Sequence, residues 1–330
     1  MGLITKKDFS EVKRFELNFN QLKILFSLQY LITREDAEET KDQKRFVKRQ
    51  WMRSWSASIH DYLGGLDASH TRKFYTLSEI KQAVNMELMD TPSNRTWYPI
   101  VILEATSFIP YTILRRNKSD DKAYMKLRFT KQTNYIKRLV GERGIVKTED
   151  VERFEEEYQK VCFQLKETKT KIRDIFVHRF AGVKGAALSS ASLAAVAGGA
   201  IGVNETEEGS TVSIVGGGAL LGLAIDQADI GIMDLLIVSF PEFTFLQAAR
   251  LEVVVKEIIL NKQQNVMLAK HILNDYAEQI KKVNNYIQDL KLEGEERENR
   301  KSIKDLEQSL RYMQKTYVNI SKATAYAQNL

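Results

Sequence analysis

Cysteine, proline and histidine are scarce in this chain: 330 residues include one cysteine, Cys162, four prolines and four histidines. A lone cysteine excludes a disulfide framework and a cysteine-based zinc site, and it fits a reducing compartment. No pair of histidines has metal-ligand spacing with a carboxylate between them. We therefore expect no metal and no cofactor. No apolar run follows Lys6 and Lys7, so we expect a protein that begins in the cytosol.

An acidic excess is also absent, and the net charge of +6 is unevenly distributed. Between Arg115 and Arg143 ten lysines or arginines face three acids, a local excess of seven. Such a surface attracts the phosphates of nucleic acid or of anionic lipid headgroups, and it is also compatible with a simple solvated face. The candidate anion-binding residues are Arg115, Arg116, Lys118, Lys122, Lys126, Arg128, Lys131, Lys137 and Arg138.

Apolar residues at helical spacing predict several helices in the N-terminal half. One covers residues 8–32, and a second covers 42–63 and ends at Gly64-Gly65. Lysines and arginines, from Lys41 to Arg49, stand on the first turns of the second helix. Residues 100–103, between prolines, fit either a short strand or a buried helical turn.

Two helix starts are marked by capping residues. Thr76 and Glu79 have the spacing of a capping box, which opens a helix through about Met89. Thr148, followed by two acids, favours the start of a long helix that runs to about Phe180.

The C-terminal third contains two apolar stripes whose members recur every three or four residues. A short acidic segment, 293–296, separates them, so the sequence predicts an antiparallel coiled-coil hairpin. The first stripe comprises Leu268, Ile272, Tyr276, Ile280, Val283, Ile287 and Leu290, and the second comprises Ile303, Leu306, Leu310, Met313, Tyr317 and Ile320.

A glycine-rich apolar hairpin is predicted in the middle of the chain. Residues 185–204 and 209–225 contain no charged residue, and a short acidic turn joins the two segments. Eleven of the seventeen glycines lie between Gly182 and Gly231. The first segment just reaches the length of a membrane-spanning helix and the second falls short, which favours conditional insertion. Small residues at four-residue spacing allow helices to pair in lipid. The candidate insertion residues are Gly198, Gly199, Gly202, Gly216, Gly217, Gly218 and Gly222.

Other interpretations of the same hairpin remain open. The segments could be buried helices of a soluble core. Residues 211–222 could also form a strand, a glycine turn and a helix start, as in dinucleotide-binding folds, with Glu242 near the position of the ribose-binding acid. In outline the chain resembles helical pore-forming toxins, in which long helices flank an apolar tongue; this resemblance is architectural and involves no residue motif.

A charged motif precedes the hairpin: Arg173-Asp174, three further residues and His178. This spacing resembles the HEPN superfamily, and residues 55–84 resemble earlier helices of its abortive-infection-type members, which would place a HEPN-like bundle over about 45–182. The resemblance implies a metal-independent ribonuclease whose motif is duplicated across a dimer. It implies that His178 acts as acid or base on an RNA 2′-hydroxyl and that Arg173 stabilises the phosphate.

We therefore expect an all-α protein with three parts: a helical bundle at 1–182, the glycine-rich hairpin at 183–241 and a helical hairpin at 242–330. The first functional hypothesis is a cytoplasmic toxin-like effector that forms homo-oligomers, binds membrane lipid and inserts its central hairpin on activation. The alternative is a HEPN-type ribonuclease of an antiphage or toxin-antitoxin system, with RNA as partner. A non-enzymatic helical scaffold is the third.

Overall fold

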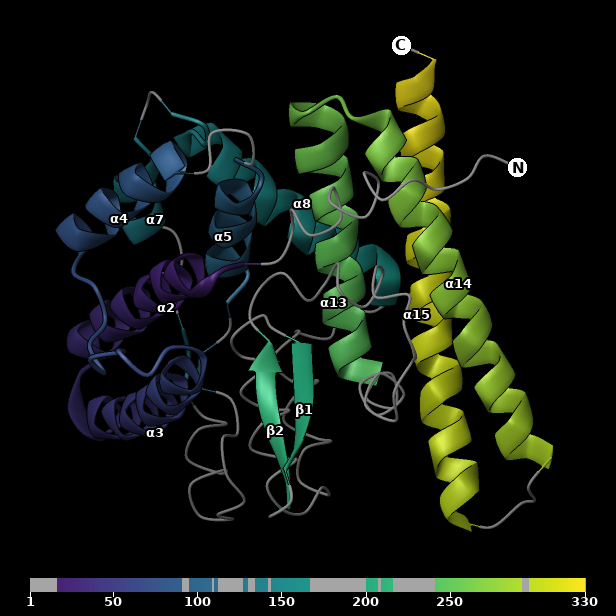
Figure 1. Ribbon diagram of the computed structural model, residues 1–330, viewed down its shortest axis with the longest axis horizontal. Coiled ribbons are helices and arrows are strands. Elements are labelled where there is room, and N and C mark those ends of the chain that lie inside the picture. Colours follow the sequence, from purple (N-terminus) through teal and green to yellow (C-terminus); the bar gives the residue numbers. More distant parts are fainter. Residues whose placement is uncertain are drawn as a thin grey trace. The chain divides into compact units, whose positions relative to one another are not determined.

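The computed structural model describes residues 17–90, 95–108, 110–111, 127–129, 134–141, 144–166, 200–206, 209–215, 241–292 and 297–329 (Figure 1). The fold is all-α, with one two-stranded sheet among the described residues. In chain order its elements are α2 (Phe19–Glu39), α3 (Asp42–Leu66), α4 (Leu77–Asp90), α5 (Trp97–Thr106), α7 (Asn134–Val140), α8 (Thr148–Lys166), β1 (Ala200–Thr206), β2 (Gly209–Val215), α13 (Pro241–Val253), the π-helix η3 (Val254–Lys262), α14 (Val266–Leu292) and α15 (Arg297–Gln328).

The chain forms two compact units. The first comprises residues 1–155 and 171–218, and the second comprises 156–170 and 219–330. Helix α8 therefore contributes its first half to one unit and its second half to the other. The three-part division at 182/183 and 241/242 stays a prediction.

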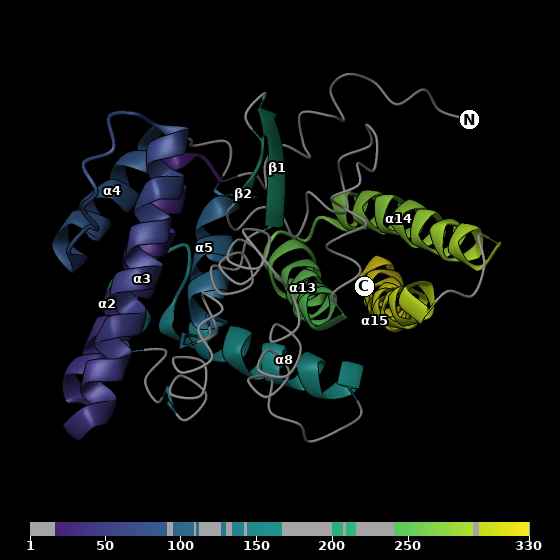
Figure 2. The ribbon, with the colours of Figure 1, turned by 90° about the horizontal axis from the view of Figure 1, so that it is seen from below.

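Helices α2 and α3 form the centre of the first unit and lie side by side (Figure 2). Asn18 and Gln21 close a capping box that starts α2, because each side chain bonds the backbone of the other. Helix α2 also packs against α4 and α5, so apolar residues around much of its circumference are buried. Full burial of each large apolar side chain contributes roughly 1.5–3 kcal/mol. The largest fully buried side chains of the first unit include Phe26, Trp51, Trp55, Trp97, Phe108 and Phe154.

Local sequence signals match several helix boundaries in this unit. The Thr76–Glu79 capping box is confirmed: Thr76 N donates to Glu79 Oε2 at 2.7 Å, and Glu79 N donates to Thr76 Oγ1 at 3.3 Å. Helix α8 begins at Thr148 as predicted, and its described part ends at Lys166.

One boundary prediction is wrong, and one open alternative is decided. The prediction that Gly64-Gly65 ends the second helix is wrong, because α3 continues to Leu66. There, Asp67 N donates to Leu63 O at 2.9 Å, so the last turn closes despite the glycines. Residues 100–103 are helical, within α5, and all four are buried. Pro99 lies in the first turn of α5, where a missing N–H costs no helical hydrogen bond.

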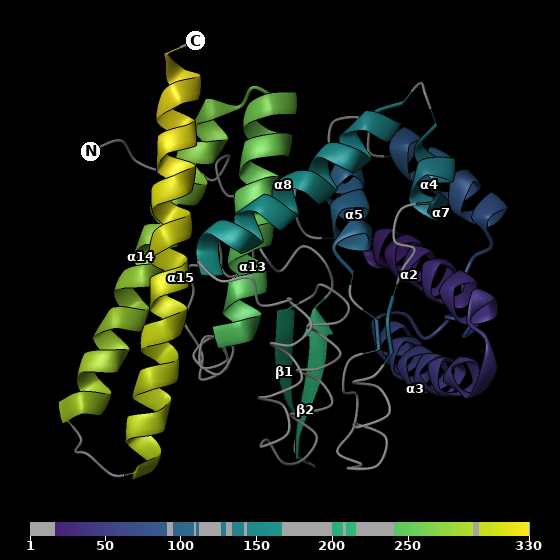
Figure 3. The same cartoon turned by 180° about the vertical axis from the view of Figure 1, so that it is seen from behind.

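The second unit is built on the pairing of α14 with α15, which lie side by side (Figure 3). Most positions of the two predicted stripes are buried, including Leu268, Ile272, Val283 and Ile287 on α14 and Leu306, Leu310, Met313 and Ile320 on α15. Helix α13 covers α15, and Phe245 packs edge-on against Tyr312 at 5.3 Å.

A buried polar network joins the helices of this unit. Glu252 is fully buried and accepts from Lys256 Nζ at 2.6 Å and from Asn319 Nδ2 at 3.0 Å. Lys256 also lies 3.4 Å from Glu157. The opposite charge and the amide satisfy the buried Glu252 carboxylate, which would otherwise be costly to desolvate.

The described part of the glycine-rich segment is an antiparallel β-hairpin. Its register pairs Ile201 with Ile214 and Val203 with Val212. Gly202 therefore lies in a strand, opposite Ser213, and its interpretation as part of a small-residue face for helix pairing is wrong. Across the described ranges, no helix is both long enough and apolar enough to cross a membrane.

Candidate functional site

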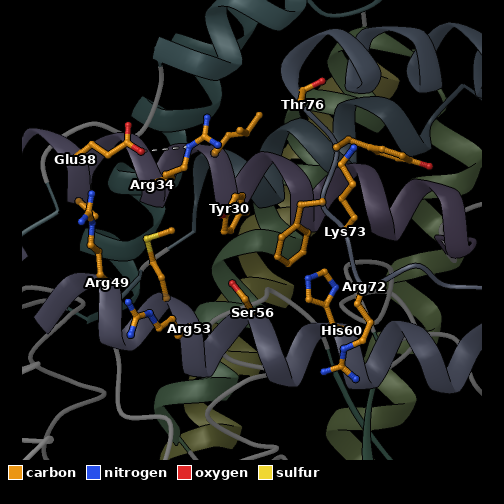
Figure 4. A pocket seen from close by; sticks show the side chains of 15 residues that line it. Tyr30, Arg34, Glu38, Arg49, Arg53, Ser56, His60, Arg72, Lys73 and Thr76 are labelled. Atoms are coloured by element: carbon orange, nitrogen blue, oxygen red, sulfur yellow. Dashed lines mark ion pairs between the residues drawn. The ribbon is translucent and has the colours of Figure 1, made fainter. Parts of the chain in front are cut away.

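A cavity of about 720 Å³ opens in the first unit between α2, α3 and the segment 67–76. We call it the α2–α3 pocket. Figure 4 shows Tyr30 of α2 and Ser56 and His60 of α3 pointing into the space between the helices. Its volume is in the range of small-molecule and cofactor sites. It is lined by Tyr30, Leu31, Arg34, Ala37, Glu38, Arg49, Met52, Arg53, Ser56, His60, Arg72, Lys73, Phe74, Tyr75 and Thr76.

The returning segment 67–76 is fixed to the helices by its aromatic residues. Phe74 stacks on Tyr30 of α2 at 4.7 Å and on His60 of α3 at 4.2 Å. Tyr75 N donates to Ser27 Oγ at 3.0 Å, which ties the segment to α2. The stacked rings therefore form one wall of the pocket and hold it open between two helices.

The charge of the lining is strongly positive. Five cationic side chains surround the pocket and face a single carboxylate, Glu38. Three of these cations have acidic neighbours: Arg34 lies 3.7 Å from Glu38, Arg72 lies 2.8 Å from Asp61 and Lys73 lies 3.5 Å from Glu79. All three pairs are substantially exposed, so each contributes little to stability and leaves its cation accessible to a ligand.

Several polar groups of the pocket lack partners. Within the described ranges neither Arg49 nor Arg53 has an ion pair or hydrogen bond, and both are exposed. Ser56 Oγ is buried without a hydrogen-bond partner among the described residues. Arg34 Nε is buried too, and its 3.7 Å distance from Glu38 is too long for a hydrogen bond. These donors point to an anionic or hydrogen-bonding ligand.

His60 and His70 form a pair at the end of the pocket, with Nδ1 of His60 2.9 Å from Nε2 of His70. Burial, together with charge repulsion from His70 and Arg72, lowers the pKa of His60 to about 4. Burial, Lys23 and Arg72 also lower the pKa of His70. Both rings are therefore neutral at pH 7, so one can donate while the other accepts.

The backbone of Arg72 is strained. Its φ of 51° lies in the left-handed region, which residues other than glycine rarely adopt. Such strain costs about 1–3 kcal/mol and is concentrated at functional sites. The segment 67–76 thus holds Arg72 beside the pocket at an energetic cost.

A buried ionic cluster fixes α3 against α2 next to the pocket. Lys48 contacts the Asp36 carboxylate, and Tyr111 Oη donates to the same Oδ2 atom at 2.6 Å. Lys48 also lies 4.9 Å from the centre of the Tyr111 ring. Burial and the bond to Asp36 raise the pKa of Tyr111. The cluster thereby positions the α3 turn that carries Arg49.

The residues predicted to be functional lie mostly outside the described residues. These include the proposed catalytic set Arg173, Asp174 and His178, and the insertion glycines except Gly202. Of the candidate anion-binding residues, Arg128, Lys137 and Arg138 are described. Lys137 lies 2.6 Å from Glu152, and Arg138 lies 3.0 Å from Glu35, so both cations have carboxylate partners.

The α2–α3 pocket was not anticipated from the sequence. The concentration of lysine and arginine at the start of α3 is visible, but its members separate in space: Lys48 is buried, whereas Arg49 and Arg53 are exposed. The four-residue spacing of Arg45, Arg49 and Arg53 was the available signal, because it places them on one helix face.

In the described ranges, no group of three histidine, cysteine, aspartate or glutamate side chains is placed to hold a metal ion. The arrangement of the α2–α3 pocket instead suits binding of phosphate groups, with aromatic rings beside them. No family model, no curated protein and no solved structure matches this chain.

Proposed function

We propose that the protein is an RNA-directed effector whose first unit binds RNA in the α2–α3 pocket. The observation that carries the proposal is the gathering of five cations against one carboxylate around a cavity of about 720 Å³. Phosphate contacts from arginine and lysine supply most of the affinity for nucleic acids. Arginine adds bidentate hydrogen bonds to phosphate oxygens.

The aromatic wall favours RNA over a lipid headgroup. Tyr30 is a partly exposed ring in the recess, backed by the buried ring of Phe74, and the bases of unpaired RNA stack on aromatic side chains. A headgroup has no flat ring to stack. The unpartnered Ser56 Oγ adds a hydrogen-bonding group for a base or a 2′-hydroxyl.

Cleavage of the bound RNA is the second half of the proposal, and it rests on the HEPN resemblance. In this scheme His178 moves the proton of the 2′-hydroxyl and Arg173 stabilises the phosphate, with Asp174 as the polar residue of the motif. Without a metal, the reaction forms a bond from the 2′-oxygen to phosphorus and breaks the bond to the 5′-oxygen, which takes a proton.

Binding and cleavage are separable by experiment. Purified protein is incubated with labelled RNA in chelator, and both retention of RNA and its degradation are measured. We expect Arg49→Ala with Arg53→Ala to weaken retention, and Arg173→Ala or His178→Ala to stop degradation while retention persists. Absence of RNA retention by the unmodified protein would refute the proposal, and unchanged degradation by both motif variants would refute the HEPN mechanism.

Membrane insertion is the second candidate, and the β1–β2 hairpin is the observation that favours it. Its register places apolar pairs, Ile201–Ile214 and Val203–Val212, at alternate positions that share one face. Each strand has seven residues, and a spanning strand needs about 9–11, so insertion would require a longer hairpin. Oligomers would then place several hairpins side by side.

Dye leakage from vesicles that contain anionic lipid tests this candidate. We expect Gly199→Asp and Gly218→Asp to abolish leakage and His178→Ala to leave it intact. Leakage that persists in both glycine variants would exclude insertion of this segment.

A further inference from the structure

A second cavity, of about 230 Å³, adjoins α3 close to its start. It is lined by Asp42, Arg45, Phe46, Arg49, Gln50 and Arg53. Arg49 and Arg53 line the α2–α3 pocket as well, so the two cavities share a boundary along α3. A ligand that fills both must cross this boundary.

Arg49 and Arg53 at this boundary continue a row that begins one turn earlier with Arg45, which lines the smaller cavity alone; we call the three residues the arginine row. Four residues advance a helix by about 6 Å, so the row presents one guanidinium at each such step on a single face. Among the described residues none of the three has a carboxylate partner. Like charges at this spacing destabilise a helix, so a bound anion would relieve the repulsion.

Each of the two cavities also has an aromatic lining. Phe46 lines the smaller cavity and is 65% exposed, which is unusual for so large an apolar ring. Tyr30 and Phe74 stack in the larger cavity. Cations that follow a backbone, with rings at intervals for the bases, are the arrangement by which proteins bind single strands.

We infer that the ligand is single-stranded RNA that crosses α3, with successive phosphates along the arginine row and bases on Phe46 and beside Tyr30. This inference rests on the proposed RNA-binding function. A duplex keeps its bases stacked inside and cannot offer them to Phe46 or to the recess beside Tyr30.

The test compares three labelled ligands by anisotropy with the full chain: a single strand of about eight nucleotides, a duplex of the same sequence and an abasic strand of equal length. We expect the single strand to bind at least about tenfold more tightly than the duplex, since base–aromatic stacking alone contributes this much. Phe46→Ala should weaken binding of the single strand about tenfold and leave binding of the abasic strand unchanged.

Two substitutions serve as matched controls. Lys81→Ala removes an exposed cation from α4, away from the arginine row, and Phe163→Ala removes a ring on α8 that is 58% exposed. Neither should change affinity for the single strand. An equal drop in affinity for Lys81→Ala and Arg49→Ala would mean that overall charge, not the row, holds the strand.

The outcomes separate this inference from the proposed function. If neither the single strand nor the duplex binds, both fail. Equal affinity for the two leaves RNA binding in place and overturns the single-strand assignment. Binding that is abolished by competing anionic vesicles, with no preference among the three RNA ligands, would assign the arginine row to lipid headgroups and overturn the inference.

Discussion

Lys48 of α3 and Asp36 of α2 form an ion pair inside the first unit, where the two residues are 4% and 2% exposed. The carboxylate also accepts the Tyr111 hydroxyl hydrogen at 2.6 Å. Because water cannot replace either partner, each charge depends on the other.

Removing one member of this pair should therefore be more harmful than removing both. We expect Asp36→Ala to lower the free energy of unfolding by about 3–5 kcal/mol, because it strands a buried ammonium. Asp36→Leu combined with Lys48→Met should cost less, since no charge is then left in the interior. Urea denaturation followed by circular dichroism measures both, and a double variant as unstable as the single one would contradict the expectation.

The salt dependence of RNA binding should report the cations of the α2–α3 pocket. For a single strand, the slope of log affinity against log salt becomes shallower by about 0.7 for each phosphate that the protein no longer neutralises. We expect Arg49→Ala and Arg53→Ala each to reduce the slope by about this amount, and Lys81→Ala to leave it unchanged. A titration at several salt concentrations gives the slopes. Slopes that do not differ from the unmodified protein would exclude these arginines from phosphate binding.

Stability should decline in mild acid because of His60. Its pKa is lowered from 6.5 to about 4 in the folded protein, so the unfolded chain binds the proton more readily between these values. The contribution of His60 to stability is thus fully present above pH 6.5 and is lost progressively as the pH falls to about 4. Solvent screening of the partly exposed ring limits the loss to on the order of 1 kcal/mol.

Thermal unfolding at pH 7.5 and pH 5 measures this loss. The variant His60→Gln, which does not titrate, should show a smaller difference between the two conditions than the unmodified protein. His70 shifts in the same direction and accounts for part of the dependence that remains. An unchanged difference in the variant would exclude His60 as a source.

The second unit offers a matched pair of substitutions on one helix. Ile320 of α15 is fully buried, whereas Val318 is 45% exposed. We expect Ile320→Ala to cost about 2–5 kcal/mol, from the reduced transfer free energy and the cavity left behind. Val318→Ala should change stability by less than about 0.5 kcal/mol. Circular dichroism melts compare the two, and equal effects would contradict the burial of the α15 stripe.

Sequence patterns predicted the helices well where the signal is local. Thr76 and Glu79 lie one turn apart, so their capping box could be recognised without knowledge of the fold. The α14 and α15 stripes repeat over many turns, and their burial follows from their period. The prediction that α3 ends at Gly64-Gly65 failed because it used helix propensity alone. The packing of α3 against α2 stabilises the helix, which continues through these residues of poor helix propensity.

The candidate site was harder to predict because it depends on tertiary contacts. Lys48 and Arg49 are neighbours in the sequence, yet one enters the interior beside Asp36 and the other lines the pocket. Phe74 belongs to an irregular segment whose return across α2 and α3 has no sequence period. Single-sequence reasoning finds charge and periodicity, but it cannot place a loop against two helices.

All three tryptophans of the chain, Trp51, Trp55 and Trp97, are buried in the first unit. Trp55 stacks on Phe74 at 5.9 Å, so a single ring separates it from the α2–α3 pocket. The tryptophan emission of the protein therefore originates from the first unit, and Trp55 lies beside the candidate site. Unlabelled protein thus contains its own optical probe: a base that stacks on the pocket wall should alter tryptophan emission, whereas rearrangement confined to the second unit should not.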